Sequence, residues 1–248
     1  HLNFSLLHKF LKPLRQENNP VLDSPLTQKI IKKPIAIAED RIFHFQYPET
    51  KEFFEEIGIP TVSWSIYKNE KIPKEAIALI IPGGFPEKYA EEISLASHSL
   101  NSLKEFYKRR FIYAECGGMM ILGDLIKDEN GKNHKMAGII PFSSRKGKLS
   151  VGYRYLKGAQ NSPLIKQSEE FKGHEFHYWQ LIKSIENHQN SSNISSHLNS
   201  PWEIRSWGNT YKLEGWANEN LHASWVHLHF PSNEVATSNF LNHLAKQF

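Results

Sequence analysis

The stretch that decides the fold reads FIYAECGG and covers residues 111–118. Its first four residues form a short apolar run, which is typical of a buried strand. Residues 119–125 then show a helical pattern, so Cys116 is expected at a sharp turn from strand to helix. Gly117 and Gly118 allow a cramped turn and leave room beside the thiol. The stretch therefore predicts a β-turn-α unit with a cysteine at its apex.

The preceding part of the chain shows the same alternation of strand-like and helical patterns. Ile35–Glu39 and Ala76–Ile81 are apolar runs, and the second ends at Pro82-Gly83-Gly84. Helical patterns over Pro48–Gly58 and Pro86–Arg109 separate the strand-like runs. Buried strands that alternate with helices predict an α/β fold, with a mostly parallel sheet and helices on both faces.

The second half of the chain favours strands. The expected strands are Met136–Phe142, Lys148–Lys157, Phe176–Ile182, Glu203–Ser206, Tyr211–Ala217 and Ser224–Phe230. A closing helix is expected over residues 233–248. Residues 1–33 contain one short apolar helical pattern and then a polar stretch, which predicts the tail of an upstream domain and a linker. Residues 34–248 form the main predicted domain, although an N-terminal arm of that same domain is the alternative for 1–33.

Composition limits the classes of function. The 248 residues carry a net charge of +4, with 40% hydrophobic and 23% charged residues. The positive charge is not gathered into a stripe, and no apolar run approaches the length of a membrane span, so neither a nucleic acid nor a membrane is an expected partner. The one cysteine cannot form an internal disulfide, which favours the reducing cytoplasm. Because the chain begins with His1, we expect it to be part of a longer protein.

Cys116 is the candidate nucleophile. A helix N-terminus carries partial positive charge, which favours a thiolate over a thiol. Gly83 and Gly84 follow the preceding strand, where backbone N–H groups can face a developing oxyanion. The alternatives are a small buried core cysteine and an ordinary Pro-Gly-Gly turn.

A cysteine nucleophile needs a partner that carries a proton. Alternation along the expected strand Ser224–Phe230 puts His227 and His229 on one face, although two structural histidines are the alternative. His174 and Glu175 form another polar cluster near Gly173. The spacing there is not that of a zinc-binding helix and no second cysteine is present, so no metal site is expected.

Together these motifs resemble the class I (triad) glutamine amidotransferases, and more narrowly the C-terminal amidotransferase domain of the cobyrinic acid a,c-diamide synthase family. The resemblance runs from about Ile35 to Phe230. The motifs that carry it are AEDRIFHF (38–45), IPGGFPE (81–87), AECGG (114–118), GYR (152–154), GHEFHY (173–178) and VHLHF (226–230).

The resemblance implies a flavodoxin-like sheet and a defined reaction. Cys116 would attack the side-chain amide of glutamine and form a glutamyl thioester, with His227 as the catalytic histidine. Backbone N–H groups near Gly84 and Gly117 would hold the oxyanion. The ammonia would pass to an N-terminal synthetase domain, where ATP and Mg²⁺ activate the a and c carboxylates of cobyrinate for amidation.

This sequence departs from the family pattern at two points. Other triad amidotransferases have a glutamate two residues after the catalytic histidine, where this chain has His229. Glu175 is a candidate substitute, and His174 and His229 are candidates for supporting roles. The chain also lacks a G-x-x-x-x-G-K-[ST] element, so no cofactor is expected within it and ATP and Mg²⁺ belong to the missing synthetase domain.

Other interpretations stay open. The acceptor of ammonia could be cobyric acid or a peptidoglycan glutamate, although Leu228-His229 favours the diamide synthase branch. A hydrolase or protease with a cysteine elbow is a second alternative, and a catalytically silent module that docks on a synthetase is a third. Retention of both Cys116 and His227 argues against the silent module. A homodimer is also left open.

Overall fold

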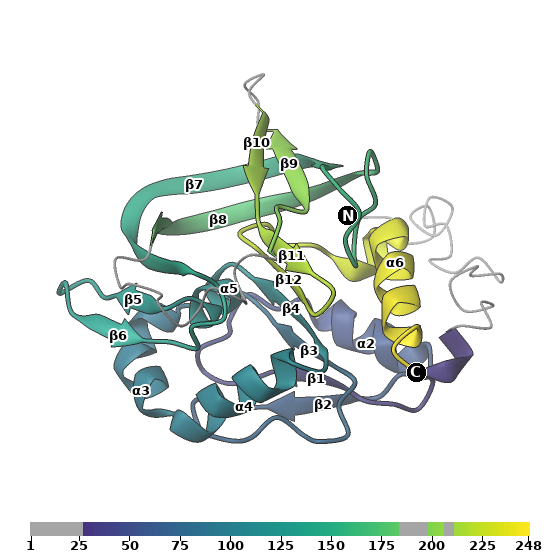
Figure 1. The fold of residues 1–248 in the computed structure, drawn as a ribbon, viewed down its shortest axis with the longest axis horizontal. Helices are drawn as coiled ribbons and strands as arrows, with labels where there is room; N and C mark the ends of the chain where they lie inside the picture. The colour runs from purple at the N-terminus through teal and green to yellow at the C-terminus, as the bar shows by residue number, and fades with distance from the viewer. Residues whose placement is uncertain (1–26, 184–197, 206–210) are drawn as a thin grey trace, which may run out of the picture.

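A computed structural model describes residues 27–183, 198–205 and 211–248 (Figure 1). Within them, the first sheet has six strands in the order β11-β12-β4-β3-β1-β2. The strands are β1 (Ile35–Ala38), β2 (Thr61–Trp64), β3 (Ala78–Ile81), β4 (Phe111–Glu115), β11 (Trp216–Asn218) and β12 (Leu221–Ser224). Every neighbouring pair is parallel except β11 with β12. The mostly parallel sheet predicted from the sequence is confirmed.

Helices cover both faces of this sheet because its central strands are apolar on both sides. The helical elements are η1 (Thr27–Lys29), α2 (Pro48–Glu56), η2 (Pro86–Tyr89), α3 (Ala90–Leu95), α4 (Ser97–Tyr107), α5 (Gly117–Leu122), η4 (Phe230–Ser232) and α6 (Glu234–Ala245). Buried residues of α2 and α6 pack on one face, and those of α3, α4 and α5 pack on the other. The helix expected over Pro86–Arg109 is divided into three pieces, with a break at Ala96, where ψ is 61°.

A second, mainly antiparallel sheet accounts for most of the later strands. Its order is β10-β9-β7-β5-β6, with β8 paired to β7. The strands are β5 (Leu125–Lys127), β6 (Asn133–Lys135), β7 (Phe142–Gly158), β8 (Glu170–Lys183), β9 (Trp202–Arg205) and β10 (Tyr211–Glu214). Strands β7 and β8 run side by side across the top of Figure 1. A backbone bridge between His174 and His227 joins this ribbon to the chain that follows β12.

Several strand and helix boundaries differ from those expected. The strand expected over Tyr211–Ala217 is divided into β10 and β11, which belong to different sheets. Residues 136–141 are not a strand, and β7 begins only at Phe142. Leu125 lies in β5 rather than in the helix after Cys116. The strand expected over Ser224–Phe230 ends at Ser224, because the chain then leaves β12 and pairs at His227 with β8. The last correction changes the environment of the candidate histidines.

The ends of the predicted domain are partly described. Residues 1–26 lie outside the described part, so the expected helix and most of the predicted linker do too. Ile30 is fully buried in the same apolar cluster as Phe54 and Phe240, and the division at residue 33 stays a prediction.

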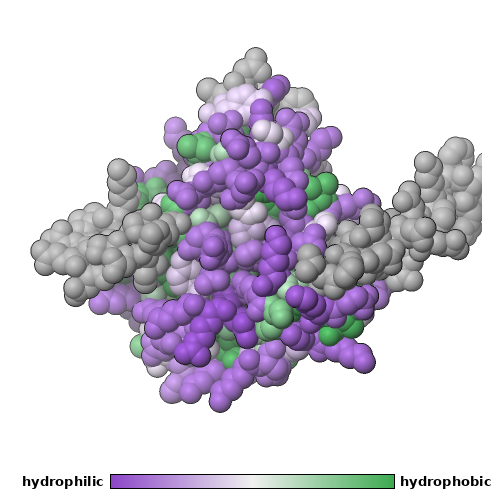
Figure 2. Space-filling model, turned by 45° about the vertical axis from the view of Figure 1, so that its right-hand side comes forward, coloured by the Kyte–Doolittle hydropathy of each residue, from purple (hydrophilic) through white to green (hydrophobic). Residues whose placement is uncertain are grey.

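Hydrophilic residues dominate the face drawn in Figure 2, with small hydrophobic patches between them. None of the helices in the described ranges has the length and apolar character needed to cross a membrane.

Candidate active site

Cys116 lies at the carboxyl end of β4 and immediately precedes α5. Its backbone has φ 47° and ψ −111°, a positive φ that is unusual for a residue with a side chain. The Cys116 N–H donates to the carbonyl of Ser224 at 2.7 Å, which ties the turn to the end of β12. The side chain is almost fully buried, with Sγ 3.8 Å from the carbonyl oxygen of Phe176. A strained turn that presents a thiol is the local geometry expected for a nucleophile.

The three candidate glycines lie together beside this turn. A β-carbon added at Gly117 would lie 2.6 Å from the carbonyl oxygen and 2.9 Å from the nitrogen of Gly84. One added at Gly84 would lie 1.9 Å from the carbonyl oxygen of Ile42. Gly83 accepts a backbone hydrogen bond from the Phe45 N–H at 3.1 Å. The loop after β3 and the start of α5 can therefore approach each other only because these positions have no side chain.

His227 is held on its backbone by the β7–β8 ribbon. Its N–H donates to the carbonyl of His174 at 2.8 Å, and the two imidazole rings stack with centroids 4.8 Å apart. The His227 side chain is buried and lies close enough to the side chain of Cys116 for that side chain to raise the pKa of the histidine. The structure thus brings the predicted nucleophile and the predicted histidine together.

The carboxylate nearest to His227 is Glu115, a residue to which the sequence motifs alone gave no role. Oε2 of Glu115 lies 3.3 Å from Nδ1 of His227. Its Oε1 accepts from the Tyr113 hydroxyl at 2.5 Å and from the Leu228 N–H at 2.9 Å. The signal that could have found it is its place in a strand whose five residues are all buried, since a buried carboxylate requires partners.

These contacts give the two stacked histidines, His227 and His174, different charges. Burial lowers the pKa of His227, but its hydrogen bonds to Cys116 and Glu115 and their negative charges outweigh burial and raise that pKa to about 10. Burial, and then the charge of His227, lower the pKa of His174. The stack therefore holds one charged ring and one neutral ring at neutral pH.

His229 does not share a strand face with His227, so that expectation was wrong. Its Nδ1 is paired with the hydroxyl of Ser232 at 2.8 Å, and its ring meets the edge of the Tyr47 ring with centroids 5.0 Å apart. The Tyr47 hydroxyl in turn lies 3.1 Å from Nδ1 of His174. His229 therefore contacts the site through Tyr47 rather than through His227.

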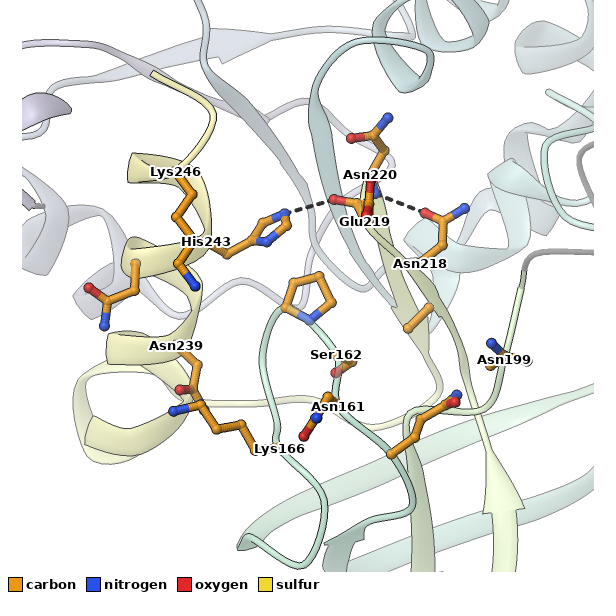
Figure 3. A pocket seen from close by; sticks show the side chains of 14 residues that line it. Asn161, Ser162, Lys166, Asn199, Asn218, Glu219, Asn220, Asn239, His243 and Lys246 are labelled. Carbon is orange, nitrogen blue, oxygen red and sulfur yellow. Dashed lines mark hydrogen bonds between the residues drawn. The ribbon is translucent and has the colours of Figure 1, made fainter.

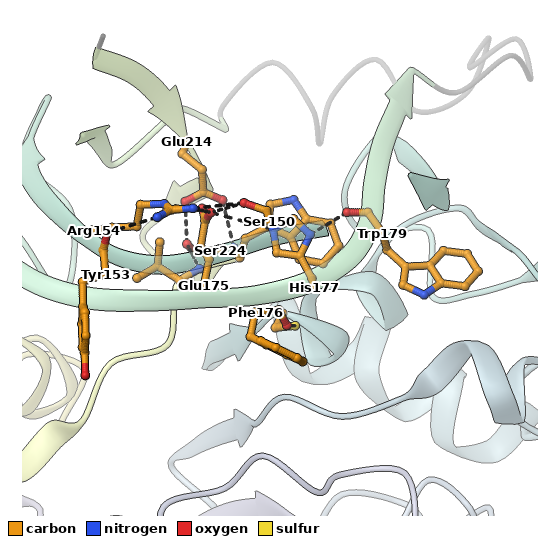
Figure 4. A network of polar contacts seen from close by, with 12 residues as sticks. Ser150, Tyr153, Arg154, Glu175, Phe176, His177, Trp179, Glu214 and Ser224 are labelled. Atoms are coloured by element: carbon orange, nitrogen blue, oxygen red, sulfur yellow. Dashed lines mark hydrogen bonds and ion pairs between the residues drawn. The ribbon is translucent and has the colours of Figure 1, made fainter. Parts of the chain in front are cut away.

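Glu175 points to the side of β8 opposite Phe176, as Figure 4 shows. It accepts hydrogen bonds from Ser150 Oγ at 2.8 Å and from Arg154 Nε at 3.0 Å, and Arg154 Nη2 lies 2.9 Å away. The structure places this carboxylate against an arginine rather than against His227. Glu175 is thus a structural ion-pair partner within the ribbon.

A wide polar pocket lies away from this site. It has a volume of about 910 Å³ and is lined by polar side chains from α6, the β11–β12 turn and the loop after β7 (Figure 3). The Asn220 carbonyl in its lining accepts from the Ile112 N–H near the start of β4, whereas Cys116 follows the end of that strand. The pocket and the thiol thus lie at opposite ends of β4. No group of three or more potential metal-binding side chains occurs within the described ranges.

Comparison with known sequences identifies the family to which this chain is similar. A profile of the CobB/CobQ-like glutamine amidotransferase domain matches residues 34–235. Cobyrinate a,c-diamide synthase of Priestia megaterium is 33% identical over 234 residues, which are 93% of this chain and 48% of that protein. The enzyme of the same name from Picrophilus torridus is 36% identical over 212 residues, or 84% of this chain and 42% of that protein. The chain spans about half the length of the curated relatives it matches.

Comparison with solved structures gives the same fold at low sequence identity. PurLQS from Thermotoga maritima has a TM-score of 0.57 at 15% identity, covering 86% of this chain and 98% of that chain. A glutamine amidotransferase from Thermotoga maritima has a TM-score of 0.51 at 14% identity, covering 78% of this chain and 74% of that chain. These likenesses concern the arrangement of helices and strands.

Proposed function

The chain belongs to the CobB/CobQ-like glutamine amidotransferase domain family, and from this premise we propose that it hydrolyses glutamine through a thioester on Cys116. The observation that carries the proposal is that Cys116, at a strained strand-to-helix turn, lies close enough to His227 to raise the pKa of that histidine, whose Nδ1 is 3.3 Å from Oε2 of Glu115. A thiol beside a histidine is the pairing that nucleophilic catalysis by cysteine requires.

The chemistry follows from this pair. His227 starts as the imidazolium paired with a Cys116 thiolate, and Sγ forms a bond to the amide carbon of glutamine while the carbonyl oxygen becomes an oxyanion. The tetrahedral intermediate collapses, the carbon–nitrogen bond breaks and the leaving ammonia takes the proton from His227. Water then attacks the thioester and gives a proton to the neutral His227, and the second tetrahedral intermediate collapses to release glutamate and restore the thiolate–imidazolium pair.

The negative oxygen of each tetrahedral intermediate needs donors. We assign this role to backbone N–H groups at Gly84 and Gly117, with Gly83 shaping the loop. The close approach of Gly84 to the start of α5 supports the assignment. Donors fixed by the fold stabilise such an oxyanion without reorganising during the reaction.

We propose further that the ammonia serves the ATP- and Mg²⁺-dependent amidation of the a and c carboxylates of cobyrinate in cobalamin biosynthesis. The support is that relatives named cobyrinate a,c-diamide synthase match this chain over about half their own length. The remaining half of such a protein has the size of a second domain, which would bind ATP and the corrin acceptor.

The test is glutamine hydrolysis by the wild-type chain and by Cys116→Ser, followed as glutamate release. We expect hydrolysis by the wild type and none by the serine variant, with the fold retained because the side chains are similar in size. Since the sequence contains one cysteine, covalent labelling by diazo-oxo-norleucine reports on Cys116 alone. Equal rates in the two proteins, or a wild type that neither hydrolyses glutamine nor takes up the label, would show that the assigned function is wrong.

A further inference from the structure

We propose that Glu115 is the positioning carboxylate of this site, holding His227 as a charged imidazolium directed at the thiol. The proposal rests on the proposed function. It assigns to the residue immediately before the nucleophile the role that the resembling enzymes give to a glutamate two residues after the histidine. In this chain the residue two positions after His227 is His229, whose ring is paired with Ser232.

Both oxygens of Glu115 are directed at the segment that carries His227. One oxygen faces Nδ1 of His227, and the other accepts the N–H of the next residue, Leu228. The Tyr113 hydroxyl fixes the carboxylate from within the same strand. The side chain of Glu115 thus contacts both the ring of His227 and the backbone of Leu228. Glu115 is also the last residue of β4, directly before Cys116.

Charge balance points to the same role. The side chain of Glu115 is almost fully buried, and no lysine or arginine pairs with it within the described ranges. A buried carboxylate without a compensating cation is costly. The imidazolium of His227 is the cation in contact with it, so the ionised carboxylate and the protonated ring stabilise each other.

The other buried carboxylates near this site already have different partners. Glu175 is paired with Arg154. Glu214 accepts from Trp202 Nε1 at 2.8 Å and from the Trp225 N–H at 2.9 Å, and its Oε2 also bonds to Ser224. Neither has a hydrogen bond or ion pair with His227 in the described part of the chain, which makes Glu214 a matched control for removing a buried carboxylate.

The first experiment compares Glu115→Gln with Glu214→Gln. In Glu115→Gln the carboxamide keeps the size and can still accept from Tyr113 and Leu228, but it presents an N–H to Nδ1 and so favours the neutral ring. We expect kcat for glutamine hydrolysis to fall about 100-fold, with KM changed far less, because proton transfer rather than binding is impaired. Nitrogen-15 NMR should show a neutral His227 at pH 7.5 in this variant and a charged His227 in the wild type and in Glu214→Gln.

A second experiment leaves Glu115 in place. In Cys116→Ala the thiol no longer contributes, so a His227 that stays charged at pH 7.5 is held by Glu115. A neutral His227 in this protein would overturn the proposal, even if Glu115→Gln does not fold. A folded Glu115→Gln protein with the wild-type kcat and a charged His227 would overturn it as well. Because the NMR measurement needs no turnover, failure of the proposed function and failure of this inference remain distinguishable.

Discussion

Gly83 lies directly against the ring of His227. A β-carbon added at Gly83 would stand 2.4 Å from Cε1 and 3.3 Å from Nδ1 of that ring. Real β-carbon contacts are not this short, so a side chain at Gly83 must displace the imidazole or the loop. The loop after β3 therefore sets the position of the histidine, although the two residues are far apart in the sequence.

Gly83→Ala should impair catalysis more than folding. The methyl group meets the side chain of His227, which can move, and displacing that ring by about 1 Å is enough to lower a rate by about 100-fold. We expect a loss of kcat near that size, with the far-ultraviolet circular dichroism spectrum unchanged. A variant with wild-type kcat would show that the ring tolerates the displacement or that His227 has no catalytic role.

Gly84→Ala is the matched comparison, and here we expect folding stability to be impaired more than catalysis. Its β-carbon would lie 1.9 Å from the carbonyl oxygen of Ile42, a backbone atom that cannot rotate away. Forcing extra volume into a packed site typically costs about 1–3 kcal/mol. Urea denaturation should therefore show a lower free energy of unfolding for Gly84→Ala than for Gly83→Ala. The reverse order would contradict the contacts described at this loop.

His227→Ala and His229→Ala should differ strongly in activity. Removing a general acid–base residue typically costs about 10²- to 10⁴-fold in rate, which we expect for His227. His229 pairs with Ser232 and contacts Tyr47, so its removal should lower kcat much less. Steady-state glutamine hydrolysis decides between them, and a larger loss at His229 would reverse the assignment.

Acid should destabilise this protein through His222. The ring is fully buried in β12, burial lowers its pKa to about 3, and neither ring nitrogen has a hydrogen-bond partner within the described residues. An unfolded histidine titrates near 6.5, so between about pH 6.5 and 3 the unfolded chain binds a proton that the folded chain does not. The free energy of unfolding therefore falls as the pH falls, by up to about 1.4 kcal/mol per pH unit from this group.

The variant that tests this is His222→Phe, which keeps the ring contacts with Tyr113 and Trp202 and removes the titration. Urea denaturation at pH 7 and pH 5 should show a smaller loss of stability in the variant than in the wild type. We also expect the variant to be at least as stable at pH 7, because an unpartnered buried polar group is removed. Identical losses in the two proteins would show that His222 does not cause the acid sensitivity.

The 248-residue chain should not bind Mg·ATP. Cradling a triphosphate usually needs glycine N–H groups followed by a lysine and a hydroxyl residue. In this sequence neither Gly83-Gly84 nor Gly117-Gly118 is followed by such residues, and Gly117 packs against Gly84 beside the turn at Cys116. Calorimetric titration should show no saturable binding at micromolar ATP. Saturable binding would mean that this chain carries a nucleotide site of its own.

Local sequence was sufficient to predict the parallel sheet and the turn at Cys116. The apolar run Phe-Ile-Tyr-Ala predicts a buried strand, and the following Glu-Cys-Gly-Gly predicts a sharp turn at the end of that strand. Both predictions depend only on residues that are adjacent in the chain. Gly83 and Gly84 were expected on the same side of the sheet as Cys116 for a similar reason, because the carboxyl ends of neighbouring parallel strands meet at one edge of a sheet.

The sequence by itself thus predicted the sheet and the candidate nucleophile, whereas tertiary structure alone decided which carboxylate faces His227. Alternation along a strand was expected to align His227 with His229, but the chain leaves β12 after Ser224 and pairs with β8. That path turns Leu228 and His227 back toward Glu115 and leaves His229 beside Tyr47. The positions depend on where two distant segments cross, and hydrophobic periodicity carries no information about such a crossing.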